Sequence, residues 1–177
     1  MRSNNTKIIA DIGICIALAL ILSYFKLFRM PQGGEVSLEM LPLLILVLTA
    51  GFWPGLIGGC LFGIFHFFQA PFAIHPVQVL LDYPLAFGSL SVAALFTKRL
   101  TMLNLYIGVT AAVFLRFLFH CVSGYIFFKS YIPEFANPWF YSIVYNASYI
   151  IPVLLILYLL MPFIYRITKT RSLRTYK

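Results

Sequence analysis

Six long apolar stretches, separated by short polar breaks, constrain this chain more than any other feature. Only 10% of its residues are charged and 62% are hydrophobic, whereas a soluble domain carries about 25% charged residues. The sequence therefore predicts an all-α integral membrane protein, in which 1–177 form one domain, a compact bundle of six transmembrane helices. We expect the spans over about 8–25, 39–53, 55–69, 77–97, 101–128 and 138–165.

Basic residues are distributed unevenly between the two sides of this bundle. Six spans place both termini on one side, which carries Arg2, Lys7, Lys98, Arg99, Arg166, Lys169, Arg171, Arg174 and Lys177. The opposite side carries Lys26, Arg29 and Lys129 beside Glu35 and Glu134. Cytoplasmic loops are rich in Lys and Arg, so we expect both termini to be cytoplasmic. The same bias explains the net charge of +8 without nucleic acid as a partner.

Small residues recur four positions apart in two spans, as Gly13 and Ala17, Cys15 and Ala19, and the ladder Gly55, Gly59 and Gly63. Small residues at this spacing let another helix approach closely. The face of the first span serves either internal packing or the docking of a partner subunit. The ladder of the third span is predicted to pack tightly against a neighbouring helix.

The stretch HPVQVLLDYPLAF at 75–87 is unusual for an apolar span, because it contains Asp82 and Pro84. A carboxylate and a proline inside such a span are both costly. The expected topology places further polar side chains at the same outer depth, on several different helices: Glu39, His66, His75, Arg116, His120, Tyr141, Tyr145 and Asn146. A small-molecule pocket that opens to the outside is the simplest account of this shared depth.

The residue types in this pocket indicate its ligand. Two carboxylates, Glu39 and Asp82, accompany one cation, Arg116, and the surrounding aromatic residues are Tyr83, Phe127, Phe128, Trp139 and Tyr141. Carboxylates and aromatic faces suit a flat cationic ligand, through charge, stacking and cation–π attraction. Asn146 can donate and accept hydrogen bonds, so it can read the edge of a heteroaromatic ring. Trp139 is expected at the pocket rim.

Each polar residue also has a purely structural interpretation. Asp82 and Arg116 could form a buried ion pair, His120 could be a core histidine, and Glu39 could be a solvated interfacial cap. His66 lies among phenylalanines, and we interpret it as structural. Tyr141 and Asn146 are five positions apart, about 140° around a helix. They flank one ligand only if the first turn is irregular or one side chain reaches across.

Patterns for catalysis and for metal binding are not found in the sequence. It lacks a Ser/His/Asp arrangement, an H-E-x-x-H motif and a glycine-rich phosphate loop. Its three cysteines lie in apolar spans, without the spacing of a disulfide framework or a metal site. We therefore predict a protein that is not an enzyme, with no catalytic residues, no metal and no cofactor. If it transports a solute, it needs a partner or an ion gradient to drive that transport.

Three motifs resemble those of a known family: GGEVSLEMLP at 33–42, HPVQVLLDYPLAF at 75–87 and RFLFHCVSG at 116–124. With six short spans in about 180 residues, the chain resembles the ThiT-type thiamine transporter over essentially its whole length. That family is the substrate-binding S-component of energy-coupling factor (ECF) transporters. The resemblance implies high-affinity capture of thiamine from outside a bacterial cell, by a multi-pass protein of the plasma membrane.

The resemblance also implies which residues bind thiamine and which partners take part. The family's binding residues fall on Glu39, Asp82, Tyr83, Arg116, His120, Phe128, Tyr141 and Asn146. Phe128 stands where the family often has a stacking tryptophan, and the first loop lacks the tryptophan with which some members cap the site. The implied partners are a transmembrane coupling subunit and two cytoplasmic ATPase subunits, with docking at Gly13 and Ala17.

Three other functions compete with this one. The chain could be an S-component for another vitamin, a membrane enzyme that acts on lipid through His120 and Asp82, or a gradient-driven carrier. An enzyme of that kind needs a polar cluster that opens laterally to lipid. A carrier needs a second, inner polar cluster for alternating access, and Asp11 is the single candidate there.

Overall fold

The computed structural model describes residues 2–31, 33–69, 71, 73–128, 132 and 136–175. Lys129, Glu134 and Lys177, which entered the charge argument, lie outside these residues. The main helices are α1 (Arg2–Tyr24), α2 (Met40–Ala50), α3 (Phe52–Gln69), α7 (Met102–Phe127), α8 (Pro138–Leu159) and α9 (Met161–Thr175). A hairpin of β1 (Phe28–Arg29) and β2 (Glu35–Val36) joins α1 to α2.

The fourth predicted span is helical throughout but changes its winding along its length. It consists of α4 (Pro76–Leu80), a π-helical turn (Leu81–Leu85), α5 (Ala86–Gly88), a 3₁₀ turn (Ser89–Val92) and α6 (Ala93–Phe96). From the sequence, Pro84 was expected only to be costly inside this span. The structure accommodates this proline in the wider π turn, which also contains Asp82 and Tyr83. Such turns are frequent at functional sites.

The prediction of an all-α integral membrane protein is confirmed. Within the described part of the chain, five helices are long and apolar enough to cross a membrane: Asn5–Tyr24, Phe52–Gln69, Pro76–Phe96, Met102–Phe127 and Pro138–Leu159. The span expected over 39–53 is α2, which has only 11 residues and is about 16 Å long. The span expected over 138–165 breaks at Leu160, so that α8 and α9 are separate helices.

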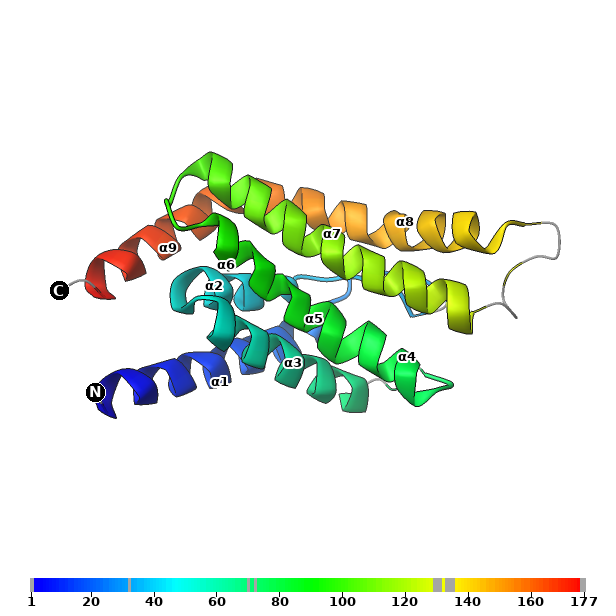
Figure 1. The fold of residues 1–177 in the computed structure, drawn as a ribbon, viewed down its shortest axis with the longest axis horizontal. Coiled ribbons are helices and arrows are strands. Elements are labelled where there is room, and N and C mark those ends of the chain that lie inside the picture. Colours follow the sequence, from blue (N-terminus) through cyan, green and yellow to red (C-terminus); the bar gives the residue numbers. More distant parts are fainter. Residues whose placement is uncertain are drawn as a thin grey trace.

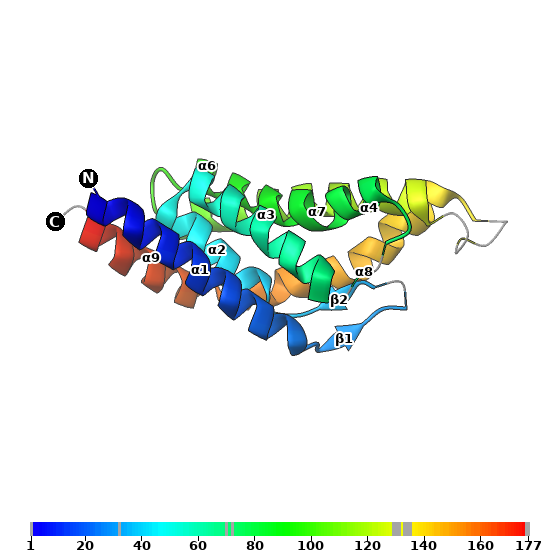
Figure 2. The same cartoon turned by 90° about the horizontal axis from the view of Figure 1, so that it is seen from below.

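The helices run side by side along the long axis of the molecule, and both termini lie at the same end (Figure 1). The β1–β2 hairpin follows the far end of α1, away from the termini (Figure 2). This arrangement agrees with an even number of passes through the bundle. It places the start of α2, the end of α3 and the start of α8 in the half of the bundle that is remote from the termini.

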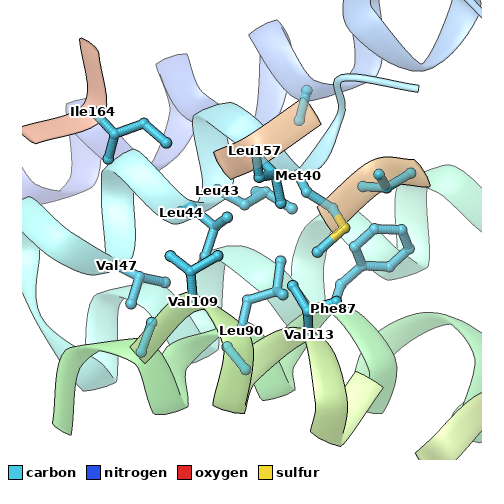
Figure 3. Packing of buried hydrophobic residues seen from close by; sticks show 14 of the residues in the cluster. Met40, Leu43, Leu44, Val47, Phe87, Leu90, Val109, Val113, Leu157 and Ile164 are labelled. Carbon is cyan, nitrogen blue, oxygen red and sulfur yellow. The ribbon is translucent and has the colours of Figure 1, made fainter. Parts of the chain in front are cut away.

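The core forms around α2, whose side chains point into the space between the other helices (Figure 3). Leu43, Leu44 and Val47 of α2 are almost completely buried. They belong to one cluster with residues of α5, α7, α8 and α9, among them Phe87, Val109, Val113, Leu157 and Ile164. A short helix surrounded by protein does not need to match the thickness of the bilayer, which explains why 11 residues suffice here.

The glycine ladder of α3 packs tightly against neighbouring helices, as predicted: Gly55 lies against Val47 of α2, and Gly59 and Gly63 lie against the fourth span. A Cβ atom on Gly59 would lie 2.4 Å from the carbonyl oxygen of Phe87, and one on Gly63 would lie 2.5 Å from the carbonyl carbon of Tyr83. The Sγ of Cys60, on the same helix, donates to the Pro84 carbonyl oxygen at 3.4 Å. The α3 backbone therefore fixes the position of the π turn.

The two small-residue pairs of α1 face in different directions. Cys15 and Ala19 are buried within the bundle, whereas Gly13 and Ala17 are exposed. A Cβ atom on Gly13 would have no neighbour within 4 Å. Internal packing therefore accounts for Cys15 and Ala19 but leaves Gly13 and Ala17 available on the outer face.

Gly63→Ala tests this close approach. The added methyl group would collide with backbone of the π turn, so we expect a loss of about 1–3 kcal/mol in the free energy of unfolding. Thermal unfolding of the purified protein in detergent measures the change as a lower Tm. Gly13→Ala is the matched control and should leave Tm unchanged or slightly raised, because alanine favours helix. Equal Tm values for the two variants would contradict the packing argument.

Candidate functional site

A pocket lies in the half of the bundle remote from the termini. It encloses about 940 Å³ of empty space, counting its open mouth. The hairpin, the start of α2, α3, the π turn, α5, α7 and α8 contribute to its lining. All eight residues predicted to bind substrate line it: Glu39, Asp82, Tyr83, Arg116, His120, Phe128, Tyr141 and Asn146.

Two side chains of α7 hold the carboxylate of Asp82 in place. Its Oδ2 accepts a hydrogen bond from the Ser123 hydroxyl at 2.7 Å, and its Oδ1 lies 3.1 Å from Nδ1 of His120. Ser123 is completely buried. These two contacts fix the carboxylate of the π turn against the helix that carries RFLFHCVSG.

Arg116 continues this network to the start of α2. Its Nε donates to Nε2 of His120 at 3.2 Å, and its Nη2 lies 3.5 Å from Oε1 of Glu39. The guanidinium also lies 4.0 Å from the ring centre of Phe87. Arg116 therefore pairs with Glu39, and the alternative of an Asp82–Arg116 ion pair is wrong.

These contacts define the protonation of His120. An arginine N–H can only donate, so Nε2 of His120 accepts and the ring proton lies on Nδ1, where it is donated to Asp82. The imidazole is then neutral. Because the charge of Arg116 is compensated by Glu39, the negative charge of Asp82 remains for a ligand, and this part of the pocket suits a cation.

Glu39 and His66 form the other end of the network. Glu39 is only 4% exposed and makes no side-chain hydrogen bond to the helix that it precedes, so the interpretation as a solvated cap is wrong. Nε2 of His66 lies 3.4 Å from Oε2 of Glu39. His66 lines the pocket, which corrects its purely structural interpretation. The sequence contained a sign of this position, because His66 follows Gly63 by three positions and therefore lies on the same face of the helix.

The aromatic residues separate into two groups. Tyr83, Phe128 and Tyr141 line the pocket. Phe127 instead stacks on His75 with ring centres 5.3 Å apart. Trp139 stacks on Tyr125 at 4.1 Å. Phe127 and Trp139 are absent from the described lining, so the expectation that they surround the ligand does not hold. His75 caps α4 by accepting from the Val77 N–H at 3.1 Å.

Both polar atoms of the Asn146 side chain form hydrogen bonds within α8. Its Oδ1 accepts from the Tyr149 hydroxyl at 2.6 Å, while its Nδ2 donates to the Ser142 carbonyl at 2.8 Å. Tyr141 and Asn146 both line the pocket on a helix that begins regularly, capped by Asn137. Of the two conditions set by the sequence, an irregular first turn or a side chain that reaches across, the first is therefore not met.

The hairpin closes one side of the pocket and was not predicted as part of the site. The Gly34 N–H donates to the hydroxyl of Tyr145 at 3.3 Å. A Cβ atom on Gly34 would lie 2.4 Å from the Tyr149 ring, so only glycine permits this contact. Glu35 pairs with Lys26 at 2.6 Å and with Arg29 at 3.3 Å. Arg29, Gly33, Gly34, Glu35, Tyr145 and Tyr149 all line the pocket.

Comparison with known proteins places this chain in a family. Residues 9–172 match the family described as thiamine transporter protein. The chain is 36% identical over 160 residues to the thiamine transporter ThiT of Bacillus subtilis, covering 82% of this chain and 83% of that protein. It is 24% identical over 156 residues to ThiT of Lacticaseibacillus paracasei, covering 80% and 78%.

A solved structure shares the fold. ThiT from Listeria monocytogenes superposes with a TM-score of 0.78 and 23% sequence identity, over 92% of this chain and 98% of that one. At this identity the likeness concerns the fold alone, and the family match and the Bacillus relative carry the assignment. The chain therefore belongs to the thiamine transporter protein family, multi-pass proteins of the bacterial plasma membrane that are transporters and not enzymes.

Proposed function

We propose that this protein is the high-affinity thiamine-binding S-component of an ECF-type importer. It captures thiamine in the pocket between the hairpin, the π turn, α7 and α8, which faces the outside. ATP hydrolysis by partner subunits then drives uptake. The relatives named as thiamine transporters support the substrate, and the chemistry of the pocket supports the mode of binding.

The observation that carries the proposal is the state of Asp82. Its carboxylate is half-buried beside His120, while the charge of Arg116 is directed to Glu39. Thiamine joins an aminopyrimidine to a cationic thiazolium. A cation placed near Asp82 supplies the missing positive charge, and Tyr83, Phe128 and Tyr141 provide aromatic faces for the two rings.

The remaining predicted residues have supporting roles in this proposal. Arg116 and His120 keep the two carboxylates apart and oriented. Asn146 presents the edge of its carboxamide, already fixed by Tyr149 and Ser142. Phe128 provides a smaller stacking surface than the tryptophan often found in the family, and the first loop lacks the tryptophan with which some members cap the site.

The outer face of α1 is the proposed docking surface. Gly13 and Ala17 are exposed there, and small side chains allow a helix of a coupling subunit to approach closely. The partners would be one transmembrane coupling subunit and two cytoplasmic ATPase subunits. The ATPase subunits would bind on the cytoplasmic side of the membrane, where both termini of this chain are expected.

Calorimetry tests substrate binding. We expect nanomolar affinity for thiamine, reduced about ten- to a hundredfold by Asp82→Asn, because a charge-assisted contact is lost. His120→Ala should give a loss of similar size. Asp11→Asn removes a carboxylate that lies outside the pocket and pairs with Arg171 at 3.0 Å, so it should retain the affinity. Tighter binding of another vitamin by the unmodified protein would overturn the thiamine proposal.

Co-purification tests the docking surface. The double variant Gly13→Leu and Ala17→Leu should no longer retain the coupling subunit and the ATPases, because the added side chains keep the helices apart. Cells that express the double variant should also take up less labelled thiamine, because the complex is lost. Val144→Leu, at an exposed position of α8, is the control. Thiamine affinity measured on the same preparations shows whether each variant is folded, and an intact complex with the double variant contradicts docking at this face.

A further inference from the structure

Exposed cations gather at the end of the bundle that carries both termini. The α6–α7 connection and α9 also lie at this end (Figure 1). Several exposed Lys and Arg side chains there form no ion pair within the described part of the chain, and we call them the basic rim: Lys7, Lys98, Arg99, Arg166 and Lys169. Arg171 differs, because it pairs with Asp11 at 3.0 Å.

The carboxylates of the described chain lie mostly at the other end of the bundle. Three of them line the pocket, where each contacts a Lys, Arg or His side chain: Glu35, Glu39 and Asp82. Asp11 is the one described carboxylate near the termini, and Arg171 already pairs with it. The charge of the basic rim therefore has to be compensated by something other than the described carboxylates.

The basic rim continues an apolar face that is exposed. Arg166 follows Phe163 by three positions and Lys169 follows Arg166 by three, so these side chains lie on the same side of α9. Phe163 is 52% exposed, and Leu159 at the end of α8 is 81% exposed. In a protein that spans a membrane, such an apolar face contacts acyl chains. Long cationic side chains directly beyond it reach the depth of the lipid headgroups.

The cations of the basic rim are presented by ordered elements. The Asn104 side chain donates to the Arg99 carbonyl at 2.8 Å, while the Asn104 N–H donates to the Thr101 hydroxyl at 3.1 Å. The α9 helix packs on α2, α7 and α8, and Nζ of Lys169 lies 5.7 Å from the ring centre of Tyr165. Side chains on fixed backbone lose less conformational freedom when they bind a ligand than those of a flexible tail.

We propose that the basic rim binds the phosphate groups of anionic phospholipids, in the leaflet on the side of the termini, with Arg166 and Lys169 as the principal contacts. The phosphate supplies the missing negative charge, and a guanidinium can bind it through two parallel hydrogen bonds. The acyl chains of the same lipid cover Leu159 and Phe163. An acidic protein surface would match the charge alone, whereas a lipid matches both the charge and the apolar face beside it.

Native mass spectrometry of the full-length purified protein, with defined lipids added to the detergent micelles, tests this proposal. The probes are phosphatidylglycerol, which is anionic, and phosphatidylcholine with the same acyl chains, which has no net charge. We expect phosphatidylglycerol to bind at least about tenfold more tightly, since each Lys or Arg near an anionic surface contributes about fivefold in affinity. The double variant Arg166→Gln and Lys169→Gln should reduce this preference at least about fivefold.

The matched control is the double variant Arg166→Lys and Lys169→Arg, which keeps both charges and should keep most of the preference. Equal affinity of the unmodified protein for the two lipids would overturn the inference, and so would an unchanged preference in the glutamine variant. Thermal unfolding shows whether each variant is folded. If the glutamine variant is not, the unmodified protein decides: exposed charges are screened in about 0.5 M ammonium acetate, and a preference that does not fall there contradicts binding through the basic rim.

A protein partner is the competing occupant of this surface. If the glutamine variant keeps its lipid preference but no longer co-purifies with ATPase subunits, the basic rim contacts protein and the assignment to lipid is wrong. A variant that loses the lipid preference and keeps those subunits supports the inference. Thiamine binding takes no part in these outcomes, so this inference and the proposed function stand or fail separately.

Discussion

The guanidinium of Arg116 is the charge on which the polar interior depends. It is 8% exposed, within a helix long and apolar enough to span the membrane, where an unpaired charge is costly. Three contacts compensate it, with Glu39, with His120 and with the face of Phe87. Removing one member of such a network leaves the others buried without partners. The positions of both carboxylates therefore depend on this one side chain.

The network links elements that are distant in sequence. From Ser123 it passes through Asp82, His120 and Arg116 to Glu39 and His66, which joins α7, the π turn, the start of α2 and the end of α3. Backbone packing supports it from behind, since the glycines of α3 contact the same turn. Side-chain charge and backbone contact thus fix one wall of the pocket together, which is the preorganisation that tight binding of a small ligand needs.

Much of this site could be predicted from the sequence because polar residues inside membrane spans are rare, and each one is informative. Asp82, Arg116 and His120 were identified in this way. Their pairing was not, since depth along a helix says little about which neighbour a long side chain reaches. His66 was missed because the surrounding phenylalanines resemble ordinary packing.

Other parts of the fold depended on tertiary context that hydropathy does not contain. Pro84 marked this span as unusual, but hydropathy shows neither the π turn that accommodates it nor the close approach of Gly63 to that turn. Phe127 ends α7 and Trp139 lies in the first turn of α8, and their rings stack on His75 and Tyr125, which hydropathy could not predict. For this reason the residue types in the sequence predicted the polar side chains of the pocket better than the aromatic side chains around it.

The short helix α2 explains how a pocket reaches into a membrane protein of this size. The hydropathy of an apolar segment is the same whether lipid or protein surrounds it. The sequence of 39–53 therefore predicted a full membrane span. Because α2 is enclosed by other helices, it can end early and leave the hairpin and Glu39 inside the bundle. Irregular backbone at such a depth is tolerated only where protein buries it or a cavity meets it. The hairpin satisfies both conditions, through Tyr145 and the pocket, and the shortened helix is what creates space for a ligand.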